Sequence, residues 1–404
     1  MSASVKISPS DWLAQAEKLQ PETIALRRAI HEEPELGLFT PKTTQKAKAA
    51  LKGLPLTIKE GPSTTGFVAI LEGARPGPTV LLRGDMDALP MPEDAEVSFK
   101  SRIAGAMHAC GHDSHTAMLA SAAKILCAQR SQLSGQVVFM FQPGEEGWHG
   151  ARFMLEDGLL DDPKPDAAFA LHIMPNAPAG LFGSRAGAML ASSDTITITV
   201  RGRGGHASMP HHALDPIPVA CAIVTAMQTL VTRQIDAFDP VVITFGKIEA
   251  GTTSNVIPES AYLLGTLRAV SERARQTAQE GIRRVAEGIA AAHGAVAEVS
   301  IENGFPVTVN DAAAFGFARD TLSALFGDAA FTTSAHPVMG AEDFSYVLQR
   351  IPGAFVFLGV CPDGQDWRTA CPCHSNQMVM NEAVMARGVA AHCALAAEFL
   401  ARGF

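Results

Sequence analysis

Side chains that bind metal ions stand at four places along the chain, as a thiol, imidazoles and carboxylates. They are Cys110, His112, Glu145, Glu146, His172 and His374. Thiolate, imidazole and carboxylate donors together are typical of a transition-metal site. In an adjacent glutamate pair, one carboxylate can bind an ion while the other acts as a general base. The set therefore predicts metal-assisted hydrolysis.

Each of these residues also has an ordinary structural explanation. Cys110 and His112 alone fit a buried free thiol beside a polar histidine equally well. The glutamate pair alone fits a solvated acidic turn better than a metal site, and His172 alone is more often a hydrogen-bonded structural histidine. Asp85 and Asp87 either cap a turn or orient a ligand imidazole. On extended backbone, Cys110 and His112 face the same side and the two glutamates point apart. The metal-site hypothesis requires all of these residues to meet.

Three short apolar runs place these residues at strand ends. They are residues 79–83, 136–141 and 166–171, and they precede the Asp85 region, the glutamate pair and His172. Short apolar runs bounded by Gly or Pro are typical of buried strands, and residues 114–130 have a helical pattern. Open α/β sheets place their sites beyond the carboxyl ends of strands, so the pattern predicts one shared site.

A different pattern covers residues 193–301. Strands are expected at 195–200, 241–245, 261–265 and 296–301, and helices at 215–232 and 271–292. This β-α-β-β-α-β order predicts a ferredoxin-like unit. Because His374 follows this unit and must return to the metal site, we expect an inserted domain at 188–301. The catalytic domain is then discontinuous, comprising 1–187 and 302–404.

Composition excludes several classes of protein. A chain of 404 residues with 47% hydrophobic and 18% charged residues is typical of a globular protein with two domains. The net charge of −9 argues against nucleic-acid binding. No apolar run reaches the roughly 18 residues of a membrane span, and Met1–Gln20 lacks the pattern of a signal peptide. Seven cysteines in so long a chain predict a reducing, cytoplasmic setting.

Two further sequence features bear on the class of protein. Cys371-Pro-Cys373-His374 suits a small zinc or redox site, but no second cysteine pair stands at zinc-ribbon spacing. The chain also lacks a Gly-x-Ser-x-Gly motif, so a serine hydrolase has little support.

The chain resembles the hippurate hydrolase and N-acyl-amino-acid amidohydrolase family, relatives of aminoacylase and of two-metal carboxypeptidases. The matching motifs run in one order over nearly the whole chain. They are Leu26–Glu35, Arg83–Pro90, His108–Asp113, Gln142–Glu146, Gly204–Ser208, Thr253–Pro258, Gly265–Arg268, Gly340–Phe344 and His374–Ser375.

The resemblance implies a role for each matching residue. The implied metal ligands are Cys110, as the bridge, with His112, Glu146, His172 and His374. Glu145 matches the general base and Asp87 the carboxylate behind the ligands. His206, Asn255 and Arg268 match groups that meet the substrate. Trp148 and His149 depart from the small residues of many relatives, and His149 either adds a ligand or, as we favour, shapes the pocket. Asp85 stands where the wider superfamily often has a ligand histidine.

The resemblance also implies the activity and the assembly. The catalytic domain would be α/β, with a mixed sheet flanked by helices, and the inserted α+β domain would serve as lid and dimerisation domain. Two divalent ions per subunit (Zn, Mn, Co or Ni) would assist cleavage of N-acyl amino acids, such as N-benzoyl or N-acetyl compounds, in a homodimer or higher homo-oligomer. A dipeptide hydrolase of aminopeptidase or carboxypeptidase type, a catalytically silent metal-binding homologue and a thiol redox protein remain alternatives.

Overall fold

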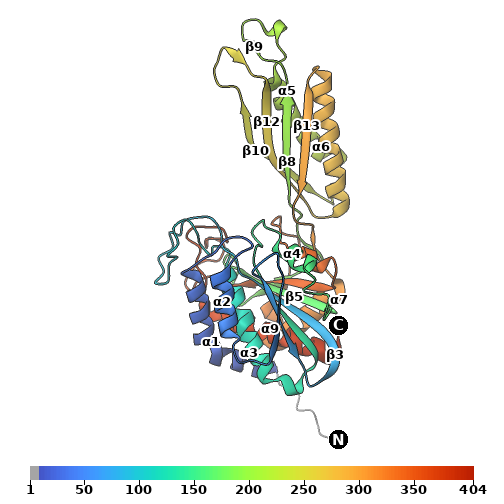
Figure 1. The fold of residues 1–404 in the computed structure, drawn as a ribbon. Helices are drawn as coiled ribbons and strands as arrows, with labels where there is room; N and C mark the ends of the chain where they lie inside the picture. The colour runs from blue at the N-terminus through green and yellow to red at the C-terminus, as the bar shows by residue number, and fades with distance from the viewer. Residues whose placement is uncertain (1–8) are drawn as a thin grey trace. The chain divides into compact units, whose positions relative to one another are not determined.

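The structure, a computed structural model, describes residues 9–404 and contains two compact units (Figure 1). The first unit contains the residues up to Gly187 together with Val309–Ala335 and Asp343–Phe404. The second contains Ala188–Thr308 and His336–Glu342. The short strands β7 (Gly187–Leu190) and β14 (Thr308–Asn310) contain the first two points where the chain passes between units.

An eight-stranded mixed sheet forms the centre of the first unit, in the order β1-β2-β4-β3-β5-β16-β6-β15. The strands are β1 (Leu56–Glu60), β2 (Phe67–Glu72), β3 (Arg75–Asp85), β4 (Ser134–Gln142), β5 (Ala167–Met174), β6 (Phe182–Ser184), β15 (Phe331–Thr333) and β16 (Gly353–Gly359). The three strands expected from apolar runs are confirmed as β3, β4 and β5. They are parallel neighbours, so their carboxyl ends meet at one edge.

Helices cover this sheet, and strand β3 is buried along its second half because α3 and α9 pack against it. Helices α1, α2 and α3 lie side by side (Figure 1). The helices are α1 (Pro9–His31), α2 (Pro41–Ala50), α3 (His112–Ala128), α4 (Gly150–Glu156), α7 (Ala312–Phe326), α8 (Ser345–Leu348) and α9 (Met385–Arg402). Short 3-10 turns occur at Arg130–Gln132, Asp328–Ala330 and Glu382–Val384.

The second unit has a four-stranded antiparallel sheet in the order β10-β12-β8-β13, packed against two helices. Its main elements are β8 (Asp194–Arg201), α5 (Pro216–Gln234), β10 (Val241–Ala250), β12 (Ser260–Ala269), α6 (Glu272–Ala292) and β13 (Val296–Asn303). This is the expected ferredoxin-like order. A ribbon of β9 (Gly205–His206) and β11 (Val256–Ile257), with a 3-10 turn at Pro210–His212, extends from it.

Capping side chains begin both helices of this unit. Asp215 accepts a hydrogen bond from the Ile217 N–H, and Ser271 accepts one from the Ala274 N–H. The expected domain boundary at residue 301 falls inside β13, because that strand pairs with β8 as far as Asn303.

Within residues 9–404, two helical segments have the length and hydropathy of a membrane span. One is Glu382–Arg402, of which 78% is buried, as in the core helix of a globular protein. The other is α5, of which 33% is buried; its buried side chains pack against the sheet of the second unit. Such helices alone are weak indicators of a membrane, and the expected absence of a span stays a prediction.

Candidate metal centre

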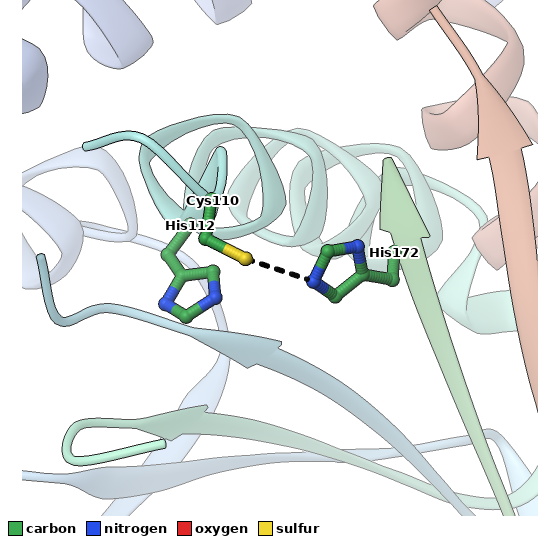
Figure 2. Close-up of side chains that lie close together, drawn as sticks. All are labelled: Cys110, His112 and His172. Carbon is green, nitrogen blue, oxygen red and sulfur yellow. Dashed lines mark hydrogen bonds between the residues drawn. The ribbon is translucent and has the colours of Figure 1, made fainter. Parts of the chain in front are cut away.

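Cys110 and His112 flank a sharp turn at the start of α3. Gly111 between them has φ +78°, and a Cβ atom there would lie 2.3 Å from the Ile173 Cδ1, so only glycine fits. The expectation of an extended segment is therefore wrong, because the left-handed glycine begins the helix at His112. The two side chains nevertheless lie together, and the Cys110 thiol points toward His172 at the end of β5 (Figure 2).

Two imidazoles present a nitrogen to this space because each donates its other N–H to a backbone carbonyl. His172 Nδ1 lies 2.6 Å from the Ile173 oxygen, and His172 Nε2 lies 3.4 Å from the Cys110 sulfur. His112 Nδ1 lies 2.9 Å from the Asp87 carbonyl oxygen. Its buried Nε2 makes no hydrogen bond, although an Asp85 carboxylate oxygen lies 3.5 Å away. A buried imidazole nitrogen without a hydrogen bond is costly unless something binds it, so the geometry suits a metal ion.

The charges around these imidazoles differ. Burial lowers the pKa of His172 well below its usual value, so the ring is neutral. Burial also acts to lower the pKa of His112, but the carboxylates of Asp85 and Asp87 outweigh it and raise that pKa to about 10. A cation at His112 Nε2 would satisfy the same carboxylates in place of the proton.

Glu145 and Glu146 lie in a turn after β4, so the expectation of extended backbone is wrong here too. The Asp87 carboxylate holds this turn: Oδ1 accepts the Glu145 N–H at 2.9 Å, and Oδ2 accepts the Glu146 N–H at 3.0 Å. The carboxylate is farther from the imidazole that it was expected to orient, with Oδ1 3.6 Å from His112 Nδ1. Asp87 therefore fixes the backbone of the glutamate pair.

His374 joins the cluster from the C-terminal part of the chain. Its N–H donates to the Ala109 carbonyl at 2.8 Å, and its Nε2 lies 3.2 Å from a Glu146 carboxylate oxygen. Burial acts to raise the pKa of Glu146, but the His374 and His112 imidazoles together outweigh it and hold that pKa below its usual value. The two side chains suit one ion, with Glu146 ionised.

The donors form two triplets that share one sulfur. Cys110, His112 and His172 form one triplet, and Cys110, Glu146 and His374 form the other; within each, the donor atoms lie within 4.8 Å of one another. A carboxylate oxygen of Glu145 lies within the same distance of His112 and Glu146 donors. The structure thus brings the five expected ligands and Glu145 together, and the mixed donor set fits transition-metal ions.

His115, which the sequence analysis missed, supports the end of β5. Its Nδ1 donates to Asp85 at 2.6 Å, and its Nε2 accepts the Ile173 N–H at 2.9 Å. Asp85 is fully buried and also pairs with Arg83. It therefore holds other side chains in place and does not merely cap a turn. The sequence could have indicated this role, because His112 and His115 are three residues apart and therefore lie on one face of a helix.

A second buried network fixes the strand that precedes the glutamate turn. Arg83 Nε donates to the Gln142 amide oxygen at 2.9 Å, and the Gln142 amide N–H donates to Asp343 at 2.8 Å. Asp343 also accepts the Ala151 N–H at 2.8 Å. Burial raises the pKa of Asp343 to about 6, although Arg83 opposes the shift. The turn is thereby held between β4 and α4.

Trp148 and His149 connect the glutamate turn to α4. Trp148 is 55% exposed, and its ring lies against Gly37. His149 has φ +59°, and its Nδ1 lies 2.9 Å from the Tyr346 hydroxyl oxygen. No donor group found within residues 9–404 includes His149, so pocket shape remains the favoured role.

The three expected substrate-binding residues lie in the second unit. His206 is exposed on β9, where its Nδ1 accepts the Ser208 hydroxyl at 2.8 Å. The Asn255 carbonyl accepts the Ala207 N–H at 3.1 Å, just before β11. Arg268 on β12 is half-buried, and burial lowers its pKa. Their approach to the metal centre stays a prediction.

A mixed α/β sheet that gathers these donors and a neighbouring glutamate at its strand ends defines a metal-dependent hydrolase. The chain belongs to peptidase family M20/M25/M40, whose model matches residues 81–398. This confirms the resemblance seen in the sequence at the level of the family, and the chain is a metal-dependent amidohydrolase of this group.

Similar proteins carry both peptidase and amidohydrolase names. Thermostable carboxypeptidase 2 of Saccharolobus solfataricus is 38% identical over 395 residues, covering 96% of this chain and 95% of its own. IAA-amino acid hydrolase ILR1-like 2 of Arabidopsis thaliana is 39% identical over 381 residues, covering 93% and 85%. The Bacillus subtilis YXEP protein, described as a dinuclear metal binding peptidase, matches in structure with a TM-score of 0.82 and 33% identity. That match covers 95% of this chain and 99% of the other.

Proposed function

We propose that this chain hydrolyses the amide bond of N-acyl amino acids, releasing a carboxylic acid and a free amino acid. Two divalent ions, drawn from Zn, Mn, Co and Ni, would bind the two triplets that share Cys110. The observation that carries the proposal is this shared sulfur together with Glu145, whose carboxylate lies within 4.8 Å of the His112 and Glu146 donors. The dinuclear description of the YXEP protein supports a pair of ions.

Glu145 is suited to move a proton. The clamp from Asp87 fixes its backbone, and its carboxylate belongs to the donor cluster without being needed in either triplet. Bound ions would lower the pKa of a water molecule and polarise the amide carbonyl. Glu145 would take the proton of that water and return it to the leaving amine.

The second unit would bind the substrate. His206 would stabilise the oxyanion, and Asn255 would add a polar contact. Arg268 would hold the substrate carboxylate with two parallel hydrogen bonds, a geometry that a guanidinium provides and an ammonium does not. The roles of these three residues are proposed from the family motifs that contain them. We also propose a homodimer in which the second unit serves as lid and dimerisation domain.

Hydrolysis of dipeptides by the same residues is the second candidate. The carboxypeptidase relative and the IAA-amino acid hydrolase relative are equally similar to this chain, at 38% and 39% identity. Both reactions need the same donors and the same general base, so only substrates can separate them.

A substrate panel with two variants tests the proposal. N-acetyl, N-benzoyl and indole-acyl amino acids, and matching dipeptides, are assayed with each of the four metals. We expect turnover of N-acyl amino acids. Glu145→Gln should lower kcat by about 10²–10⁴ with metal content unchanged. Cys110→Ala should lose bound metal, because a thiolate ligand is removed.

Each outcome has a definite meaning. Loss of both ions in Glu145→Gln would show that the roles of the glutamate pair are reversed. Absence of hydrolysis across the whole panel, by wild-type protein with its metal bound, would refute the proposal in favour of a silent metal-binding homologue.

A further inference from the structure

The Cys371-Pro-Cys373-His374 segment contributes only His374 to the donor triplets, which leaves Cys373 without an assigned role. The hydrogen bond from the His374 N–H to the Ala109 carbonyl, at 2.8 Å, sets this segment beside the one that carries Cys110. Hydrogen-bonded backbones lie about 5 Å apart, within the roughly 4.4–6.8 Å that a disulfide requires between Cα atoms. Backbone spacing therefore permits a bond between Cys110 and Cys373.

Both sulfur atoms lie at the end of β5, and both cysteines are free. The neighbouring Cys373 thiol raises the pKa of the buried Cys110 thiol. The Cys110 sulfur lies 3.4 Å from His172 Nε2, and the Cys373 sulfur lies 3.9 Å from the carbonyl oxygen of the next residue, Ile173. Cys110 is buried, whereas Cys373 is partly exposed and reachable by a small oxidant.

We propose that Cys110 and Cys373 are a redox modification site, at which a peroxide forms a reversible disulfide that releases the bound metal. The metal-release step rests on the proposed role of Cys110 as the shared ligand. The Cys373 sulfur attacks one peroxide oxygen, the O–O bond breaks, and a sulfenic acid and water result. The Cys110 sulfur then attacks the Cys373 sulfur and displaces the second oxygen as water. Two thiols and hydrogen peroxide thus give one disulfide and two molecules of water.

The disulfide would release metal because Cys110 belongs to both donor triplets. A disulfide sulfur no longer carries the thiolate charge that binds an ion. Because both triplets contain this sulfur, one bond removes a ligand from each. A dithiol reductant reverses the reaction by thiol–disulfide exchange, after which metal can bind again.

The experiment compares wild-type holoenzyme with Cys373→Ser and Cys371→Ser. Each protein is treated with hydrogen peroxide before and after removal of metal with a chelator. Free thiols are then alkylated, and peptide mass spectrometry identifies disulfide-linked cysteines, while a chromogenic chelator measures released metal. Cys371→Ser is the matched control, since it removes a thiol two residues away on the same segment.

We expect wild type and Cys371→Ser to yield one linked peptide pair containing Cys110 and Cys373. Metal should be released in proportion to this linkage and rebind after dithiothreitol. Cys373→Ser should show neither the linkage nor reductant-reversible metal release. The absence of the linkage in both holo and metal-free wild type would overturn the proposal. Linkage without metal release would instead overturn the release step and the ligand role of Cys110, leaving the thiol pairing itself intact.

Discussion

Replacing Asp87 with asparagine tests how the glutamate turn is held. The Asp87 carboxylate accepts the N–H groups of both Glu145 and Glu146, one with each oxygen. An asparagine side chain has nearly the same shape but only one acceptor oxygen, and it places an NH₂ group against the second N–H. Asp87→Asn therefore removes half of the clamp and leaves one backbone donor of the turn without a partner.

The expected loss of folding stability follows from the change in these two hydrogen bonds. A bond to a charged acceptor contributes about 1.5–3 kcal/mol, and a neutral one about 0.5–1.5 kcal/mol. One bond is lost and the other becomes neutral, which costs roughly 2–4 kcal/mol. The substitution also removes a negative charge that raises the pKa of buried Asp343, and this relief offsets part of the cost. We expect a net destabilisation of about 2 kcal/mol and metal affinity lower by about 10–100-fold.

Urea unfolding of the metal-free proteins measures stability, and competition with a chromogenic chelator for zinc measures affinity. Asp157→Asn is the control, because Asp157 also accepts a backbone N–H, from Ser63 at 3.0 Å, and the Ser63 hydroxyl at 2.6 Å. It belongs to none of the donor groups in the described part of the chain. The control should lose stability while keeping the zinc affinity of wild type.

Zinc affinity of Asp87→Asn equal to that of the wild type would contradict this prediction. Such a result would mean that the position of Glu146 does not depend on the clamp. Equal loss of zinc affinity in Asp157→Asn would point instead to a general loosening of the unit.

Three further predictions concern a buried histidine and the second unit. Burial acts to lower the pKa of His31, but the carboxylates of Asp113 and Glu93 outweigh it and raise that pKa to about 9. The protonated ring should therefore stabilise the fold fully below pH 6.5, and the loss between about pH 6.5 and 9 should be on the order of 3 kcal/mol. Urea unfolding across this range should show that loss in wild type and not in His31→Gln; equal slopes would contradict it. If His206 acts in trans, mixing His206→Ala with Glu145→Gln should recover part of the activity, and no recovery despite proven subunit exchange would exclude that model. Arg268→Lys should raise KM for carboxylate substrates about tenfold with a smaller change in kcat, because one of two parallel bonds is lost; an unchanged KM would remove Arg268 from the substrate site.

The sequence predicted the strands of the site because their short apolar runs are continuous and are followed directly by polar residues. Residues 79–83, 136–141 and 166–171 became three adjacent parallel strands, and the ferredoxin-like order of the second unit was also predicted. Local periodicity determines such elements, since burial on both faces of a strand requires a continuous apolar run.

Turn geometry and contacts between distant segments were not predictable in this way. The left-handed Gly111 and the turn at Glu145 depend on neighbours that the local sequence does not reveal, such as Ile173 and Asp87. The network from Arg83 to Asp343 joins residues 260 positions apart. No periodicity carries such information, because the pairing exists only after the sheet has formed.

The discontinuity of the first unit has a consequence for biosynthesis. Strand β5 pairs with β3 on one side and with β16 on the other, and the whole second unit is translated between β5 and β16. A ribosome adds about 5–20 residues per second, so the nascent chain exposes an unpaired apolar strand edge for many seconds. The second unit has its own hydrophobic core and can fold during this interval, whereas the metal site must wait for His374.

Chains that end before Gly353 should therefore aggregate rather than accumulate as inactive soluble protein, because the edge of β5 is never covered. The yield of full-length protein should depend on how well the cell shields that edge while translation continues. For this enzyme, the last part of the chain to be made completes both the sheet and the metal-binding cluster.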